Sequence, residues 1–314
     1  GSVDEEGTLT SSHELLQQET SSLFGENSKE QEERLRRNSP YGALKSWKVL
    51  RIIVKSNDDL RQEQFAMQLI TQFHSIFQKA KAPLWLHPYE ILSIGPDCGI
   101  MEVVKDAMSI DGLKKKVKAS TLREFFETNF PGEERFKKAQ RAFCDSLAAY
   151  SLVCYFLQIK DRHNGNILID NEGHIVHIDF GFFLSNAPGK GIKFEKAPFK
   201  LTSEFVEVMG GPGSKPFERF RRSIVKGFYA AQKNAEKIII MVEMMRQGYG
   251  DTMPCFIGGD SVLEELRKRF FPRSKMTKMD SQNYADKLIK DSLDNWTTRW
   301  YDKYQYWFEG IFMQ

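Results

Sequence analysis

The chain of 314 residues lacks the features that mark several common protein classes. Its four cysteines form no C-x-x-C pair and have no metal-site spacing, so we expect free thiols in a reducing compartment. No apolar run approaches the roughly 18 residues of a membrane span. Lysine and arginine total 45 and aspartate and glutamate 42, a balance that does not predict nucleic-acid binding but allows a local basic patch.

The composition nevertheless predicts a folded protein with a sizeable core. Hydrophobic residues make up 41% and aromatic residues 12% of the chain, and the length suits two packed lobes. Residues 1–38 are polar, acidic and serine-rich, so we expect a flexible lead-in with room for one exposed helix. Its opening Gly1-Ser2 is typical of a tag scar, and order is expected to begin near Ser39.

Residues 39–104 are expected to form a small N-terminal lobe with an antiparallel sheet and one main helix. The β-branched run from Trp47 to Lys55 predicts a strand, and residues 85–95 predict another. Between them, Asn57 and Asp58 are typical helix caps, and the apolar spacing that follows is helical.

Residues 105–314 are expected to form a larger, mainly helical C-terminal lobe. Apolar residues from Phe136 to Leu157 recur on one face, as in a long buried helix, and aromatic residues share a face in a predicted C-terminal helix over 295–312. The sequence thus predicts an α+β fold of two lobes. The lysine-rich segment 113–118 predicts a solvated face or loop, with membrane contact as the alternative.

The stretch from Lys160 to Gly181, "KDRHNGNILIDNEGHIVHIDFG", combines a turn with two polar loops. Two apolar runs flank Asn171-Glu172-Gly173, which predicts a hairpin. Because a hairpin brings its outer ends together, Asn166 and Asp179 are expected to meet and present oxygen ligands. Few, hard oxygen ligands suit Mg²⁺, which takes its remaining ligands from water and phosphates.

These residues predict phosphoryl transfer, which needs a metal, a lysine on the phosphates and a base for the attacking hydroxyl. Lys55 ends a strand and can supply the lysine, and Glu63 is placed to orient it. Either His163 or Asp161 can supply the base. Each element alone has a simpler interpretation as a turn, a core histidine or a strand end. Their combination in one order predicts a kinase site.

Two motifs carry a resemblance to a known family. "DRHNGN" with "HIDFG" and "KSNDDLRQE" (Lys55–Glu63) resemble the phosphatidylinositol 3- and 4-kinase superfamily. The chain lacks both the His-Arg-Asp order and the G-x-G-x-x-G loop of ordinary protein kinases, and "SPYGALKSW" stands where that loop would be. "PLWLHPYEIL" and "GFFLSNAPGKGIKFEKAPFKLTSEFVEVMGG" are most similar to type III phosphatidylinositol 4-kinases, the beta form above all. The resemblance covers roughly residues 39–312.

The resemblance implies roles for individual residues. Lys55 would contact the ATP phosphates, with Glu63 and Tyr89 lining the pocket behind it. The catalytic loop, 160–166, would use Asp161 and His163 on the inositol hydroxyl. The other implied positions are Glu102, Val103 and Val104 in the hinge that binds adenine, Ile178 under the adenine, Asn166 and Asp179 on the metal, Asp-Phe-Gly at 179–181 and an activation loop over 182–201.

The family also implies partners and a location. ATP and Mg²⁺, with Mn²⁺ as an alternative, would be the cofactors, and membrane phosphatidylinositol would be phosphorylated at its 4-hydroxyl. We expect a cytoplasmic monomer, peripheral on membranes including the Golgi, that binds no nucleic acid and meets regulatory proteins through regions outside this chain. The activation-loop lysines, Lys190, Lys193, Lys196 and Lys200, are spread out, which suits a headgroup with a single phosphodiester.

Three alternative functions remain open at this point. A phosphatidylinositol 3-kinase would share the mechanism, and a related large Ser/Thr protein kinase would share the Asp-Arg-His and Asp-Phe-Gly motifs. A scaffold that keeps the kinase fold for binding is the third alternative. It is disfavoured because the lysine and both metal ligands are present.

Overall fold

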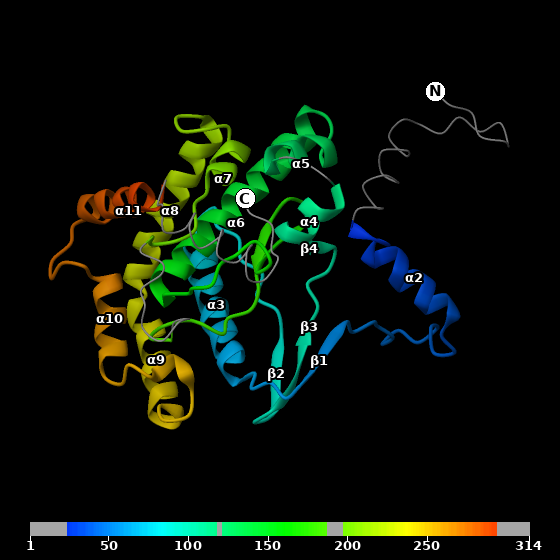
Figure 1. The fold of residues 1–314 in the computed structure, drawn as a ribbon, viewed down its shortest axis with the longest axis horizontal. Coiled ribbons are helices and arrows are strands. Elements are labelled where there is room, and N and C mark those ends of the chain that lie inside the picture. Colours follow the sequence, from blue (N-terminus) through cyan, green and yellow to red (C-terminus); the bar gives the residue numbers. More distant parts are fainter. Residues whose placement is uncertain (1–23, 118–120, 187–196, 294–314) are drawn as a thin grey trace.

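The computed structural model describes residues 24–117, 121–186 and 197–293, which fold into a smaller part containing a sheet and a larger helical part (Figure 1). The smaller part contains α2 (Ser28–Asn38), β1 (Ile52–Ser56), α3 (Arg61–Lys79), β2 (Ile91–Gly95) and β3 (Cys98–Glu102). The larger part contains β4 (Ala107–Ser109), α4 (Ile110–Val117), α5 (Leu122–Asn129), α6 (Glu133–Leu157), β5 (Ile167–Asp170), β6 (Ile175–His177), α7 (Ser203–Val208), α8 (Lys215–Lys233), α9 (Ala235–Tyr249), the 3₁₀ helix η1 (Pro254–Phe256), α10 (Ser261–Phe270) and α11 (Lys278–Ser292). The expected α+β architecture of two unequal lobes is confirmed.

The sheet of the smaller lobe is antiparallel, with the strand order β1-β3-β2. Lys55 near the end of β1 pairs with Gly99, and a side chain at Gly99 would lie 2.6 Å from the Leu92 carbonyl oxygen of β2. Glycine therefore lets these strands pack closely beneath α3. One face of α3 is buried, as its helical spacing predicts.

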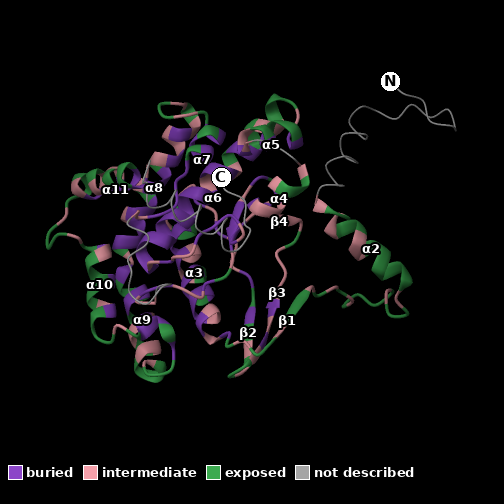
Figure 2. Ribbon diagram, in the orientation of Figure 1, coloured by how far each residue is buried: buried purple, intermediate pink, exposed green. Residues whose placement is uncertain are grey.

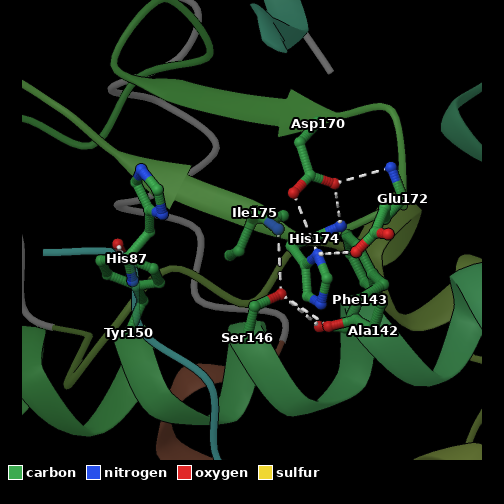
Figure 3. A network of polar contacts seen from close by, with 9 residues as sticks. All are labelled: His87, Ala142, Phe143, Ser146, Tyr150, Asp170, Glu172, His174 and Ile175. Carbon is green, nitrogen blue, oxygen red and sulfur yellow. Dashed lines mark hydrogen bonds and ion pairs between the residues drawn. The ribbon is translucent and has the colours of Figure 1, made fainter. Parts of the chain in front are cut away.

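The hairpin predicted around residue 173 is confirmed, since β5 pairs with β6 and Ile167 faces His177. The Asp170 carboxylate closes the turn by accepting the main-chain N–H groups of Glu172 (2.9 Å) and His174 (2.8 Å). Figure 3 shows how the hairpin rests on α6: the Ser146 hydroxyl accepts the Ile175 N–H at 2.9 Å. These contacts fix the turn of the hairpin on α6.

The long buried helix predicted in the C-terminal lobe is confirmed as α6, which runs through the buried interior seen in Figure 2. Its Phe156 ring stacks on Phe73 of α3 at 5.7 Å and on Phe270 of α10 at 4.3 Å between ring centroids. Aromatic packing thus joins the two lobes. Within the described ranges, no helix combines the length and apolar character needed to cross a bilayer.

Ordered structure begins earlier in the chain than the sequence indicated. The lead-in was expected to be flexible up to residue 38, but residues 28–38 form α2, the exposed helix for which the sequence left room. Its Ser28 contacts the rest of the protein through Asp106 and Arg51. Asn27 caps α2 by accepting the Lys29 N–H, which favours the helix despite its polar composition.

Two details of the smaller lobe were predicted wrongly. β1 begins at Ile52 rather than at Trp47. The helix α3 begins at Arg61 and has no side-chain cap, because Asn57 takes a left-handed conformation (φ 58°) and the Asp58 N–H bonds to the Asp97 carbonyl. The segment 57–60 is therefore a turn between strand and helix.

The lysine-rich segment is also less exposed than predicted. Residues 110–117 form α4, and Lys114 makes an ion pair with Glu204 at 2.7 Å with both side chains about nine-tenths buried. Lys115 pairs with Asp111 one turn back. The predicted C-terminal helix over 295–312 lies outside the described residues. So do residues 187–196 of the predicted activation loop (182–201), with three of its four lysines.

Candidate active site

A cavity of about 630 Å³ opens between the two lobes, a size suited to a cofactor or nucleotide. Nine of the eleven residues singled out from the sequence line it: Lys55, Glu63, Tyr89, Glu102, Val103, Val104, Asn166, Ile178 and Asp179. The other two, Asp161 and His163, lie in the adjoining loop. The chain thus gathers residues more than a hundred positions apart around one space.

Lys55 enters the cavity from β1, but it does not pair with Glu63 as the sequence suggested. Its ammonium group lies 3.4 Å from the Asp58 carboxylate, and both side chains are nearly half exposed. An exposed pair of this kind contributes little stability, so the lysine can turn to another anion at small cost.

Glu63 instead faces the Asp-Phe-Gly segment. Its carboxylate accepts the Phe180 N–H at 3.2 Å. Burial raises the pKa of Glu63, and the negative charge of Asp179 adds to this increase. Two carboxylates are therefore held close together at the inner end of the cavity, which is an arrangement that attracts cations.

Tyr89 is buried against this acidic end of the cavity. Burial raises the pKa of its hydroxyl well above the ordinary value, and the nearby Glu63 charge adds to the effect. Among the described residues, the Tyr89 hydroxyl has no hydrogen-bond partner. A polar atom left in this state is suited to bond a ligand or water in the cavity.

Asn166 and Asp179 meet at the open end of the hairpin, as predicted. The Ile178 N–H donates to the Asn166 carbonyl at 3.1 Å, which places the two loops side by side. The Asn166 amide group donates to the Asp161 carbonyl at 2.9 Å, so its side-chain oxygen remains for a ligand. Asp179 has a left-handed backbone (φ 60°) that fixes its direction.

The donor set at this point fits Mg²⁺ or Mn²⁺. One carboxylate and one amide oxygen are hard ligands, and a magnesium site normally completes its shell from water and substrate phosphates. In the part of the chain that the structure describes, no group of three or more His, Cys, Asp and Glu side chains could hold a metal. A metal at Asn166 and Asp179 would take its other ligands from water and phosphate oxygens.

The loop before Asn166 holds His163 in a defined orientation. The Gly165 N–H donates to the Nδ1 atom of His163 at 3.0 Å, and the Asn166 N–H donates to the His163 carbonyl at 3.0 Å. A neutral ring that accepts at Nδ1 carries its proton on Nε2.

Arg162 was not singled out from the sequence, although it lies between two residues that were. Its buried guanidinium donates to the carbonyls of Lys160 (2.9 Å), Ile178 (2.7 Å) and Asp179. It also lies over the Phe180 ring at 5.5 Å. One side chain thus joins the catalytic loop to the Asp-Phe-Gly segment.

Gln62 is a second residue that the sequence analysis missed. Its buried amide donates to the carbonyls of Phe180 (3.2 Å) and Gly181 and accepts the Cys255 N–H at 2.8 Å. It therefore joins α3, the Asp-Phe-Gly segment and η1. Its place one residue before Glu63 gives no sign of this role, because the three partners are distant in sequence.

The predicted hinge, residues 102–104, leads from β3 into the larger lobe. The Glu102 N–H donates to the Glu90 carbonyl at 2.8 Å, and the Val103 N–H donates to the Arg51 carbonyl at 3.0 Å. Neither of these N–H groups is therefore available to a ligand. Across the described residues, no main-chain partner is found for the Val104 N–H.

Lys200, at the end of the predicted activation loop, was expected to be one of four spread lysines suited to a lipid headgroup, but the structure places it differently. It is buried, and its ammonium group donates to the Asn164 side-chain oxygen at 3.2 Å. This contact joins the end of the loop to the catalytic loop.

The two lobes and the loops that meet between them define a kinase-like fold. A family model described as phosphatidylinositol 3- and 4-kinase matches residues 50–255, and the chain belongs to this family. It is 48% identical to a phosphatidylinositol 4-kinase of Dictyostelium discoideum over 297 residues, which are 94% of this chain and 25% of the relative.

Two further relatives carry the beta designation. Phosphatidylinositol 4-kinase beta 2 of Arabidopsis thaliana is 48% identical over 88% of this chain and 25% of its own length. Phosphatidylinositol 4-kinase beta of Rattus norvegicus is 45% identical over 88% of this chain and 34% of its own length. The chain thus spans a quarter to a third of the curated relatives that it matches.

Proposed function

We propose that this chain is the catalytic part of a phosphatidylinositol 4-kinase, which transfers the γ-phosphoryl group of ATP to the 4-hydroxyl of phosphatidylinositol. The observation that carries this proposal is the convergence of nine motif residues on one cavity of nucleotide size. The names of the relatives support the choice of lipid and of ring position.

The adenine would bind at the hinge. Since the Val103 N–H is already bonded to Arg51, we assign the N–H of Val104 as the donor to the adenine ring. Ile178 and Val104 line the cavity from the larger lobe and the hinge and provide apolar contact with the base. Lys55, released from its exposed pair with Asp58, would contact the phosphates.

Asn166 and Asp179 would hold Mg²⁺, with Mn²⁺ as the alternative. When bound, the metal supplies positive charge that neutralises the phosphate oxygens during transfer. Glu63 holds the Phe180 N–H and adds negative charge behind the metal ligands.

The proton of the attacking hydroxyl would pass to Asp161. The sequence left Asp161 and His163 as alternatives, and the hydrogen bond from Gly165 to His163 Nδ1 favours a division of roles. With its proton on Nε2, neutral His163 donates a hydrogen bond to an oxygen of the transferring group and stabilises its charge. Asp161 then serves as the acceptor.

The setting of the reaction is also part of the proposal. The enzyme would act as a monomer at the cytoplasmic surface of membranes, the Golgi among them, where phosphatidylinositol is available. Regulatory proteins would bind parts of the longer protein that lie outside this chain. These statements rest on the family resemblance.

The test is transfer of labelled phosphate from ATP to phosphatidylinositol vesicles, with the 3- and 4-phosphate products resolved. We expect the 4-phosphate, and we expect Asp179→Asn to lower kcat at least about a hundredfold because the metal loses its charged ligand. Asp291→Asn on the exposed side of α11 is the matched control and should be fully active. A 3-phosphate product would indicate the sister activity, and transfer to protein alone would indicate a protein kinase.

A further inference from the structure

The helix α2 is bonded at one end to the residues beside the hinge of the nucleotide cavity and at the other end to the loop 39–47, which does not line the cavity. None of its residues is buried, so apolar packing does not explain its position. In Figure 1, α2 (blue) begins beside β4 and α4 and ends at the chain segment that leads into β1. Polar contacts at its two ends hold it there.

The N-terminal end of α2 is bonded to the exit of the hinge. The Asp106 carboxylate accepts the Ser28 N–H at 2.8 Å and the Ser28 hydroxyl at 2.5 Å. The Arg51 guanidinium donates to the Ser28 carbonyl at 2.7 Å and to Gln31 at 3.0 Å. Since the Arg51 carbonyl accepts the Val103 N–H, Arg51 connects α2 directly to the hinge.

Asp106 itself is a constrained point in the chain. Its backbone is left-handed (φ 49°), and its carbonyl accepts the Asn171 N–H of the β5–β6 turn at 2.9 Å. The direction in which the chain leaves the hinge is therefore fixed from both sides. Its side chain is bound by α2, and its main chain is bound by the larger lobe.

The C-terminal end of α2 is bonded to the loop 39–47, which stands where a phosphate-covering loop is expected. The Arg36 guanidinium donates to the carbonyls of Gly42 (2.7 Å) and Leu44 (3.3 Å) and lies 5.6 Å from the Trp47 ring. The Trp47 indole N–H donates to the Ser39 hydroxyl at 3.1 Å. The folded shape of this loop thus depends on Arg36.

We propose that α2 is a positioning helix for ATP: Ser28 and Asp106 set the hinge, and Arg36 holds the other end of α2 against the loop 39–47. This inference rests on the proposed function, because it takes residues 102–104 as the adenine site. Ser28 acts on the hinge through the Asp106 carboxylate, and none of the three residues lines the cavity. Their effect is therefore on ATP affinity more than on turnover.

The sharpest test is Ser28→Asp, which places a carboxylate against Asp106. A negative charge in the first turn favours a helix, so α2 itself is not weakened. We expect the KM for ATP and the Kd of MgATP, measured by calorimetry without lipid, to rise about fivefold to tenfold. The kcat and the KM for phosphatidylinositol should stay within about twofold, which a general loss of structure would not allow.

Two variants make the comparison specific. Adding Asp106→Asn to Ser28→Asp should restore affinity, because the repulsion between the two carboxylates is removed. Asn27→Asp adds the same charge one residue earlier and keeps the helix cap, so it should bind MgATP almost as the parent does. Equal losses in Asn27→Asp and Ser28→Asp would overturn the proposal, since the charge and not the contact would then matter.

The outcomes separate this inference from the function on which it rests. Val104→Pro removes the proposed adenine donor and should abolish MgATP binding. If Val104→Pro abolishes binding but Ser28→Asp does not weaken it, the positioning role is wrong and the hinge assignment stands. If neither variant affects binding of MgATP, the positioning role and the hinge assignment are both wrong. If both act as expected but the parent protein forms no phosphatidylinositol 4-phosphate, the lipid assignment fails and the role of α2 stands.

Discussion

Replacing Gln62 by leucine gives a direct measure of how firmly the Asp-Phe-Gly segment is fixed. The substitution keeps the volume and the helix propensity of the side chain but removes three hydrogen bonds, to Phe180, Gly181 and Cys255. The Gly181 carbonyl keeps a partner, because the Asn186 amide also donates to it at 2.9 Å. Two buried main-chain groups would be left unpaired.

The expected loss follows from those two groups. Each unpaired buried group costs about 1–1.5 kcal/mol, so the free energy of unfolding should fall by about 2–3 kcal/mol. For a chain of this size, that corresponds to a decrease in melting temperature of about 3–5 °C. The kcat should also fall, because Asp179 lies next to the carbonyl that is released.

The assay is thermal unfolding alongside steady-state kinetics, with Gln68→Leu as the matched control. Gln68 is on the same helix but exposed, so its replacement should change stability by less than about 0.5 kcal/mol. Equal, small effects at the two positions would refute the reasoning, since the buried hydrogen bonds would then carry no net stability.

Three further predictions concern stability. Glu63→Gln should be more stable than the parent at pH 8, because burial raises the pKa of Glu63 and the folded state disfavours its ionised form. This difference in stability should shrink as the pH falls through the raised pKa and vanish below about pH 4. A difference that increases on acidification would contradict the prediction. Lys114→Met should cost about 3 kcal/mol in urea unfolding by leaving the Glu204 carboxylate buried and unpaired, and adding Glu204→Leu should recover most of that loss. Gly173→Ala should cost more than Gly132→Ala: both glycines have positive φ (93° and 86°), but only at Gly173 would the new methyl group lie 2.8 Å from a carbonyl oxygen of α6. Equal melting temperatures for the two alanine variants would show that backbone conformation alone matters.

The parts of the structure that depend on local pattern were predicted well. The β5–β6 hairpin follows from two apolar runs around a turn that contains Gly173, and α6 follows from its apolar spacing. The meeting of Asn166 and Asp179 could be predicted from the hairpin alone. In each case the determining residues are neighbours in sequence.

The start of α3 shows where local reasoning failed. Asn57 and Asp58 are residue types that cap helices, yet the helix starts at Arg61. The competing contact is the hydrogen bond from the Asp58 N–H to the Asp97 carbonyl, which holds the turn against the β2–β3 connection. A sequence pattern does not reveal a partner 39 positions away.

The missed site residues have the same explanation. Gln62 and Arg162 are polar residues beside recognised motifs, and each acts by bonding main-chain carbonyls, which any residue provides. The sequence of the partner therefore carries no sign of the contact. Residue identity predicted the groups that face a ligand, whereas the fold was needed to find those that hold other parts of the chain.

The double attachment of the Asp-Phe-Gly segment has a consequence for inhibitor design. Phe180 is fully buried, with Arg162 over its ring and Gln62 bonded to its carbonyl. A compound that needs Phe180 to swing outward must break the contacts of both side chains before it gains any of its own. Compounds for this cavity are therefore best sought beside Val104 at the hinge, where no movement of Phe180 is needed.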